Sequence, residues 1–131
     1  MQFDYTIIYV QDVAATVAFY EAAFGLSRRF VHESGDYAEL ETGSTALAFL
    51  SRRMVTELGK SPGRASAGAP CFEIAFTTAD VAAGVSRAVA AGAVLVQAPR
   101  EMPWGQTIAY VSDPNEVLVE LCTAMVPLAL A

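Results

Sequence analysis

Two stretches of the same design decide the fold of this sequence: YTIIYVQDVAATVAFYEAA at residues 5–23 and EIAFTTADVAAGVSRAVAA at residues 73–91. Aligned at a constant offset of 68 residues, they are identical at seven of the twelve positions from Asp12 to Ala23. In each stretch an apolar run typical of a strand leads to an aspartate, Asp12 or Asp80. Each aspartate is placed to cap a helix by accepting hydrogen bonds from its first free amides. Each stretch therefore predicts a strand followed by a helix.

Both predicted helices carry an apolar stripe along one face and end at a glycine. The stripe residues recur at helical spacing: Val13, Val17, Tyr20 and Phe24 in the first helix, and Val81, Val85, Ala88 and Val89 in the second. Gly25 and Gly92 follow as stop signals, because glycine readily adopts the left-handed conformation that ends many helices. Alanine-rich helices resemble one another by composition alone. The shared order of strand, cap, helix and glycine is therefore the stronger sign of a repeat.

Three strand-like segments follow each predicted helix, with turn sequences between them. They are residues 27–32, 37–42 and 45–50 in the first half, and 94–97, 106–111 and 117–122 in the second. The chain is therefore predicted to form two βαβββ modules, residues 1–50 and 71–123, within one compact α+β domain. Repetition of this kind implies pseudo-two-fold symmetry. The apolar tail, residues 124–131, is interpreted as a cover for a strand edge or a dimer interface, or as a disordered end.

A polar linker, residues 51–70, joins the two modules. It holds four of the eight basic residues of the chain: Arg52, Arg53, Lys60 and Arg64. Two interpretations stay open. The linker is a solvated connection, as loops between modules commonly are, or it is a mobile lid that supplies a cation to a pocket.

Composition limits the function classes. Hydrophobic residues make up 54% of the 131 residues and charged residues 17%, which is typical of a globular chain with apolar surface left for an oligomer interface. The formal net charge of −6 argues against binding to nucleic acid, which needs a basic face. The N-terminus resembles no signal peptide, and no apolar run approaches the ~20 residues of a membrane span. Cys71 and Cys122 lack metal-finger spacing. We therefore expect a cytoplasmic protein with reduced thiols and no membrane or nucleic-acid partner.

A single carboxylate interrupts the last apolar run, DPNEVLVELC at residues 113–122. Side chains alternate between the two faces of a strand, so Glu120 shares a face with Leu118 and Cys122, and Val119 lies on the other face. Because an isolated buried charge is too costly to leave unpaired, Glu120 is either solvated on an open face or buried with a partner.

The paired βαβββ modules resemble the vicinal oxygen chelate superfamily, which includes glyoxalase I, the bleomycin- and fosfomycin-resistance proteins and the extradiol dioxygenases. The most specific stretches are VQDVAATVAFYEAAFGL at residues 10–26 and YVSDPNEVLVELC at residues 110–122, and the similarity covers residues 3–122. The resemblance implies mixed sheets curled into a cup that holds a small molecule, and subunits that pair as homodimers. It does not settle the chemistry, since one fold serves many functions.

In metal-dependent members of that superfamily, four positions inside the cup hold a divalent ion. They map here onto Tyr5 and Glu73 on the first strands and onto Ala48 and Glu120 on the last strands. The family typically has histidine, glutamate or glutamine at the first pair and glutamate at the second, so this chain departs from the pattern. A neutral phenol is a poor ligand and a methyl group is none. The resemblance therefore implies no tightly held metal, and at most a weak divalent ion such as Mg²⁺ or Mn²⁺ at the two carboxylates. The only histidine, His32, matches no ligand position and is interpreted as a surface residue.

Without a metal, the paired carboxylates Glu73 and Glu120 allow three interpretations. They repel each other, so one can hold a proton and act as a general base on a carbon acid. They can instead receive a cationic ligand. The third interpretation is that they are a structural remnant, hydrogen-bonded to Tyr5 or to water. Glu73 and Glu120 are the candidate catalytic residues under the first interpretation.

Aromatic and amide groups supply the remaining candidate ligand contacts. Trp104, in the turn EMPWGQT at residues 101–107, is a candidate stacking platform, and Gln106 is a candidate orienting group; a packing role for Trp104 is equally open. Phe3 and Tyr9 are further candidates for aromatic walls around an amine. The candidate ligand-binding residues are therefore Tyr5, Ala48, Trp104 and Gln106.

Two function hypotheses follow from different classes. The first is a homodimeric, metal-free protein akin to the bleomycin-resistance group that binds a small aromatic or cationic molecule. The second is a lyase, isomerase or dioxygenase that uses a weak divalent metal at Glu73 and Glu120 or a metal-free carboxylate base. Loss of metal ligands at Tyr5 and Ala48 favours the first.

Overall fold

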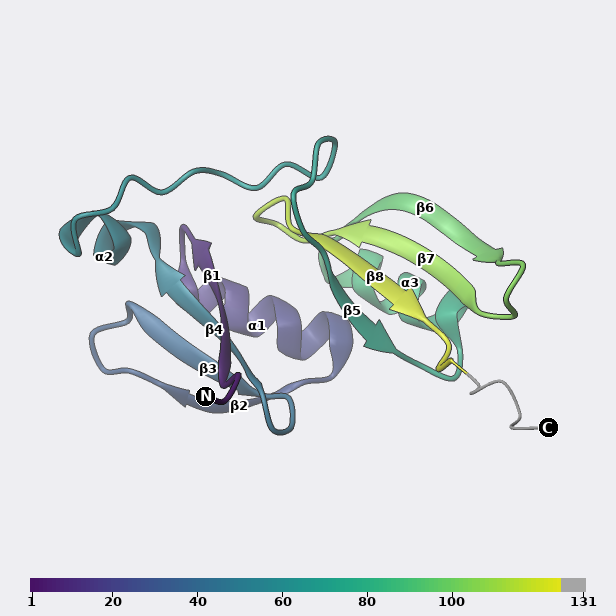
Figure 1. Cartoon of the computed structure of the whole chain (residues 1–131), viewed down its shortest axis with the longest axis horizontal. Coiled ribbons are helices and arrows are strands. Elements are labelled where there is room, and N and C mark those ends of the chain that lie inside the picture. The colour runs from purple at the N-terminus through teal and green to yellow at the C-terminus, as the bar shows by residue number, and fades with distance from the viewer. Residues whose placement is uncertain (126–131) are drawn as a thin grey trace. The chain divides into compact units, whose positions relative to one another are not determined.

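A computed structural model describes residues 1–125 of the chain, which divides into two compact units. The first unit runs from Met1 to Arg64, and the second begins at Ala65 (Figure 1). The boundary falls inside the predicted linker. Each unit contains one β-sheet with a long helix packed against one of its faces.

The first unit combines a four-stranded mixed sheet with two helices. In chain order its elements are β1 (Tyr5–Val10), α1 (Val13–Phe24), β2 (Ser27–Val31), β3 (Tyr37–Glu41), β4 (Ala46–Ser51) and α2 (Arg52–Glu57). The strands lie in the order β1-β4-β3-β2, with β1 parallel to β4 and the other neighbours antiparallel. Helix α1 packs over β2, β3 and β4.

The second unit repeats this design. Its elements are β5 (Ile74–Thr77), α3 (Val81–Ala91), β6 (Val94–Glu101), β7 (Thr107–Ser112) and β8 (Leu118–Cys122). The strand order is β5-β8-β7-β6, again with one parallel pair, β5 with β8. The predicted α+β fold of two βαβββ modules is therefore confirmed, and neither sheet is closed into a barrel.

Both helices begin and end as the sequence predicts. The Asp12 carboxylate accepts a hydrogen bond from the Ala15 amide at 3.0 Å, and the Asp80 carboxylate accepts one from the Ala83 amide at 3.0 Å. Both aspartates have extended backbone, as N-cap residues do. Gly25 and Gly92 end the helices in the left-handed region, with φ of 68° and 118°.

The apolar stripes of the helices form the core of each unit. In α1, Tyr20 is fully buried, and its ring lies 5.0 Å from that of Phe49 on β4, measured between centroids. In α3, Val81, Val85 and Ala88 are buried, but the predicted stripe residue Val89 is exposed. The expectation for Val89 was wrong because Ala88 takes the sheet-facing position in the last turn.

Two elements differ from those expected. Residues 52–57 of the predicted linker form helix α2, which the Ser51 hydroxyl caps by accepting a hydrogen bond from the Met54 amide at 3.0 Å. Strand β6 runs on through Pro99 to Glu101, beyond the predicted end at Gln97. Proline is tolerated there because β6 is an edge strand with irregular pairing to β7.

Two further expectations concern the apolar C-terminal tail and the absence of a membrane-spanning segment. Residues 126–131 of the predicted apolar tail lie outside the described residues. Within residues 1–125, no helix combines the length and the apolar character that crossing a bilayer requires.

Candidate functional site

Strand register places Glu120 on the open face of the second sheet. Its neighbours along β8, Val119 and Leu121, are buried, and Leu121 lies against Gly84 of α3. Glu120 therefore points away from the helix. Across the sheet it is paired with Ala75 of β5 and Tyr110 of β7, so the side chains of these three residues share the open face.

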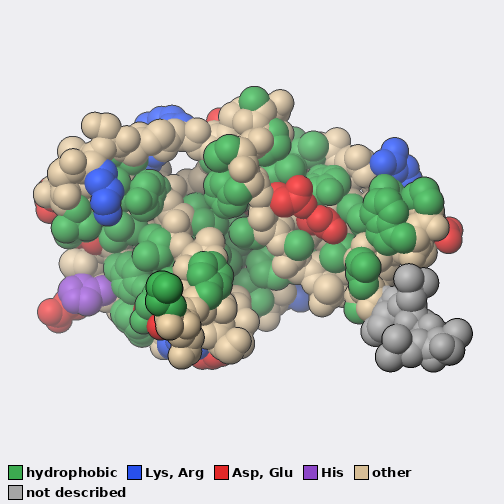
Figure 2. Space-filling model, viewed as in Figure 1, with side chains coloured by type: hydrophobic (Ala, Val, Ile, Leu, Met, Phe, Trp, Pro, Cys, Tyr) green, Lys and Arg blue, Asp and Glu red, His purple; other side chains and the backbone are tan. Residues whose placement is uncertain are grey.

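Glu73 joins Glu120 on this face. It lies two residues before Ala75, which gives it the same orientation by strand alternation. A hydrogen bond with Glu120 raises the pKa of the Glu73 carboxyl, and partial burial and the negative charge of Glu120 raise it further. Glu73 therefore keeps its proton to a higher pH than an isolated glutamate does. Figure 2 shows acidic side chains over β5 and β8, surrounded by hydrophobic ones.

Tyr110 and Cys122 complete the surroundings of the two carboxylates. The Tyr110 hydroxyl lies 3.5 Å from Oε2 of Glu120, a long contact, and burial followed by the charge of Glu120 raises the pKa of this phenol. The Cys122 thiol is buried and lies 3.8 Å from the Phe76 carbonyl oxygen. Burial, and next the hydrogen bond with Glu120, raise the pKa of this thiol, so it stays protonated and unreactive. The site is thus acidic, with neutral neighbours.

The donor set does not fit a catalytic divalent metal. Such a site usually needs at least three protein ligands. Within residues 1–125, no three histidine, cysteine, aspartate or glutamate side chains are grouped so that they could hold an ion. The neighbours of the two carboxylates are the neutral phenol of Tyr110 and the protonated thiol of Cys122. A neutral phenol and a protonated thiol are both poor metal ligands.

The first unit has positions that are structurally equivalent to Glu73 and Glu120 of the second unit. Register pairs Ile7 of β1 with Ala48 of β4, and Ala48 in turn with Glu39 of β3. The same register in the second unit pairs Ala75 with Glu120, so Ala48 is the structural equivalent of Glu120. Ala48 is fully buried. Its methyl group is on the open face of the first sheet by register, but neighbouring side chains cover it.

Tyr5 lies on the same open face of the first sheet as Ala48. Its side chain is 49% exposed, so its phenol is available to a ligand. Three other aromatic side chains of the first unit are also exposed, Phe3, Tyr9 and Phe30, as is the apolar side chain of Ile7. The open side of the first unit is therefore rich in aromatic rings.

Sequence reasoning missed a polar network in the first unit. The buried Glu39 carboxylate accepts a hydrogen bond from the Tyr37 hydroxyl at 2.8 Å and pairs with Arg29 at 3.4 Å. Arg29 also binds Glu41 through two hydrogen bonds of 2.9 Å. Burial and then the hydrogen bond to Glu39 raise the pKa of Tyr37. Alternation along YAELE, which puts the first, third and fifth residues on one face, is the signal that could have shown this network.

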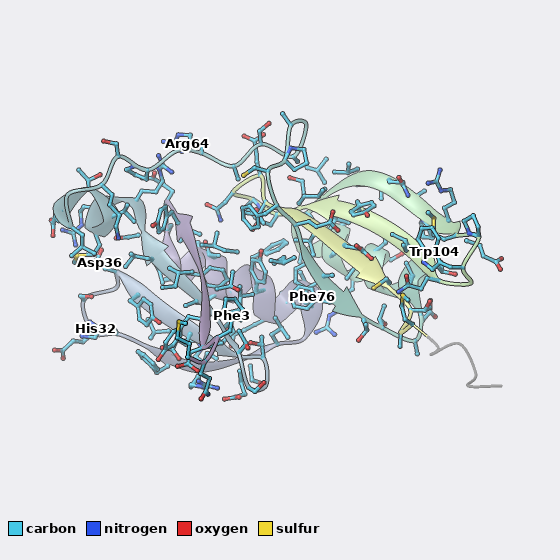
Figure 3. The ribbon with its side chains drawn as sticks, viewed as in Figure 1. Phe3, His32, Asp36, Arg64, Phe76 and Trp104 are labelled. Atoms are coloured by element: carbon cyan, nitrogen blue, oxygen red, sulfur yellow. The ribbon has the colours of Figure 1, made fainter. Side chains whose placement is uncertain are left out.

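Trp104 and Gln106 are bonded to each other rather than independent. Trp104 is 58% exposed on the loop between β6 and β7 (Figure 3), and its Nε1 donates a hydrogen bond to Oε1 of Gln106 at 2.7 Å. Nε2 of Gln106 donates to the Thr123 carbonyl oxygen at 2.9 Å. The indole is therefore held by Gln106 while more than half of the side chain stays exposed. His32 is exposed in a turn, where its Nδ1 lies 2.8 Å from the Ser34 hydroxyl.

Comparison with known proteins agrees with this architecture. Tandem βαβββ units of this kind define the vicinal oxygen chelate fold. The profile of the Glyoxalase/Bleomycin resistance protein/Dioxygenase superfamily matches residues 2–121. The chain belongs to this superfamily. None of the curated proteins compared gives a significant match.

Solved structures show the same fold at low sequence identity. A glyoxalase/bleomycin resistance protein/dioxygenase family enzyme from Burkholderia phytofirmans PsJN is 24% identical, with a TM-score of 0.78 over 94% of this chain and 98% of its own. A glyoxalase-related enzyme from Fulvimarina pelagi is 21% identical, with a TM-score of 0.81 over 94% of this chain and 88% of its own. TioX from Micromonospora sp. ML1 is 21% identical, with a TM-score of 0.69 over 94% of this chain and 98% of its own.

Proposed function

We propose that this protein binds a small cationic molecule with an aromatic body at the open face of its second sheet, without a tightly held metal. The observation that carries the proposal is the hydrogen-bonded pair of Glu73 and Glu120, which raises the pKa of Glu73. The negative charge of two carboxyl groups held together in this way has no cationic partner among residues 1–125. An ammonium group placed between them supplies that charge and can donate hydrogen bonds to both.

Aromatic groups of the second unit suit the rest of such a ligand. The aromatic ring of Tyr110 shares the face of Glu120, and the exposed Trp104 indole is fixed by Gln106 in the same unit. An aromatic ring attracts a cation through its negative face, and it also stacks on an apolar ligand body.

The chain is further proposed to act as a homodimer. Three consecutive apolar residues of edge strand β6 are exposed: Val94, Leu95 and Val96. An exposed apolar edge of this kind is a site where strands of another chain can add. Analytical ultracentrifugation tests this: a single monomeric species at micromolar concentration would refute it.

Binding of benzylamine, with benzyl alcohol as the neutral control, tests the proposed ligand class. We expect saturable binding of the amine that is lost in Glu120→Gln and in Glu73→Gln, and no binding of the alcohol. Glu101→Gln is the matched control, because Glu101 is an exposed carboxylate on β6 with no side-chain partner among the described residues. Equal affinity for amine and alcohol, or equal loss in all three variants, would contradict the proposal.

A thermal-shift series with Mg²⁺, Mn²⁺, Fe²⁺, Ni²⁺ and Zn²⁺ tests the proposed absence of a tight metal. A ligand that binds only the folded state raises the melting temperature by mass action. We expect no shift at equimolar metal. A shift that disappears in Glu120→Ala would instead support a metal-dependent lyase, isomerase or dioxygenase.

A further inference from the structure

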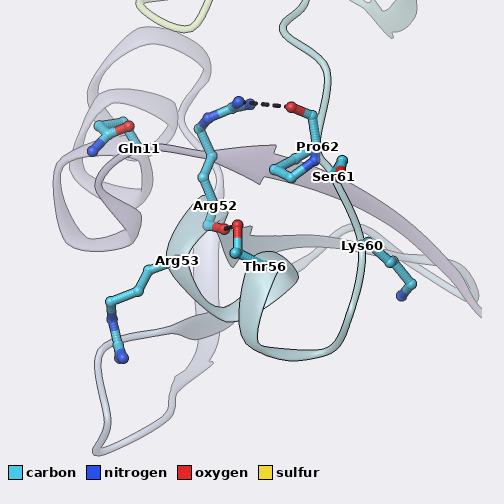
Figure 4. Close-up of a pocket in the computed structure, with 7 residues that line it drawn as sticks. All are labelled: Gln11, Arg52, Arg53, Thr56, Lys60, Ser61 and Pro62. Atoms are coloured by element: carbon cyan, nitrogen blue, oxygen red, sulfur yellow. Dashed lines mark hydrogen bonds between the residues drawn. The ribbon is translucent and has the colours of Figure 1, made fainter.

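A pocket lies in the first unit, beside helix α2. It has a volume of about 460 Å³ (Figure 4). Seven residues line it: Gln11, Arg52, Arg53, Thr56, Lys60, Ser61 and Pro62. Three of them are basic, the others are neutral, and none is a carboxylate. In a chain with a net charge of −6, this is a local concentration of positive charge.

Arg52 is held in place without losing its charge to a carboxylate. Its Nη1 donates a hydrogen bond to the Gly63 carbonyl oxygen at 2.7 Å, and its Nη2 donates to the Pro62 carbonyl oxygen at 2.9 Å. The dashed line from the Arg52 guanidinium group in Figure 4 marks the contact with Pro62. A guanidinium group has five N–H donors, so donors remain for a ligand. The carbonyl partners are neutral, so the positive charge of Arg52 remains uncompensated.

The other two cations differ from each other. Arg53 is neutralised by two carboxylates, since it forms ion pairs with Asp36 and with Glu57. Lys60 is exposed, and its ammonium group forms no hydrogen bond or ion pair with another residue of the part of the chain that the structure describes. The Ser61 hydroxyl beside it is likewise without a partner among those residues. The pocket therefore presents two uncompensated cations, Arg52 and Lys60, and a free hydroxyl.

We propose that this pocket binds the phosphate group of a small phosphorylated molecule. A phosphate monoester carries nearly two negative charges near neutral pH, which matches the two uncompensated cations. The planar fork of an arginine and the point charge of a lysine are both common phosphate contacts. The volume exceeds that of a phosphate group alone and lies in the range of small-molecule sites, so room remains for an organic part. The site shares no residue with the acidic pair of Glu73 and Glu120.

Titration of ¹⁵N-labelled protein with inorganic phosphate and with glycerol 3-phosphate, at constant ionic strength, tests the proposal. We expect saturable amide shifts centred on residues 52–62 with both probes, and tighter binding of glycerol 3-phosphate. Glycerol alone should produce none. If both phosphates bind equally, the organic part of the proposal is wrong. If shifts are absent or spread over both units, the site itself is wrong.

Three variants separate a specific site from general attraction of anions. Lys60→Gln is expected to weaken phosphate binding by about fivefold, the upper range for an exposed charge pair. Arg100→Gln is the matched control, because it removes one exposed positive charge from β6 in the second unit and should leave the affinity unchanged. Arg52→Lys keeps the charge but lacks the planar fork that holds Arg52 against Pro62 and Gly63, and it should also weaken binding. An equal loss in Arg100→Gln, or full affinity in Arg52→Lys, would overturn the assignment.

Discussion

Replacing Glu120 with glutamine is expected to stabilise the fold while abolishing ligand binding. Two like charges about 4 Å apart repel by about 1 kcal/mol at the dielectric constant of water, and by more in a partly buried site. Glu73 is exposed and Glu120 is half-buried, so the figure for water is a lower bound. The new amide also donates a hydrogen bond to the Glu73 carboxylate. The gain at pH 7.5 is therefore at least about 1 kcal/mol, which raises the melting temperature by about 3–5 °C for a chain of this size.

The sign of the pH dependence follows from the raised pKa of Glu73. Below the ordinary glutamate pKa, Glu73 is protonated in both the folded and the unfolded chain, so it contributes nothing. As the pH rises above that value, the unfolded chain releases the proton first, and the folded chain loses relative stability until Glu73 also ionises. Glu120→Gln removes the main cause of the shift. Its advantage over the wild type should therefore be present at pH 7.5 and small at pH 3.5.

Urea unfolding at these two pH values, combined with an NMR titration of the Glu73 carboxyl, checks this reasoning. In Glu120→Gln the pKa of Glu73 should move back toward its ordinary value. The control Glu101→Gln removes an exposed charge elsewhere and should change neither quantity. A variant less stable than the wild type at pH 7.5, or an equal gain at both pH values, would refute the proposed repulsion.

Three further predictions concern the surroundings of the site and the frame that holds it. Tyr110→Phe should change the free energy of unfolding by less than about 0.5 kcal/mol in urea titrations, because the hydroxyl contact with Glu120 is long. Asp12→Ala and Asp80→Ala should each lower stability by about 1 kcal/mol, and hydrogen exchange should quicken in the first turn of the affected helix alone. Glu116→Gly should raise stability by up to about 1 kcal/mol, measured by thermal unfolding, because Glu116 has a φ of 63°, where glycine is unstrained.

Local patterns were sufficient to predict the frame of both units. Asp12 and Asp80 cap their helices, and Gly25 and Gly92 end them, because these interactions involve residues only a few positions apart. Alternation along β8 likewise gave the correct face for Glu120. These features depend on geometry within a single element. Residues close together in the sequence determine that geometry, so it can be predicted from local patterns.

Several features that depend on contacts between elements were missed. The ion pairs of Arg29 with Glu39 and Glu41 require the register of β2 against β3, which shifts by a residue between Arg28 and Phe30. Such an irregularity has no clear signature in the sequence. The pocket beside α2 was missed for a similar reason. The fork of Arg52 reaches carbonyl groups ten and eleven residues further along the chain, and only the folded path of the backbone brings them together.

Proton release on ligand binding tests the central claim most directly. An ammonium ligand between Glu73 and Glu120 favours their ionised forms, so binding must displace the proton that the raised pKa of Glu73 retains. Calorimetric titration with benzylamine near pH 5, in two buffers of different ionisation enthalpy, counts the protons released. The account predicts proton release in the wild type and in Glu101→Gln. Binding of the amine without any proton release, or with the same release in Glu120→Gln, would contradict it.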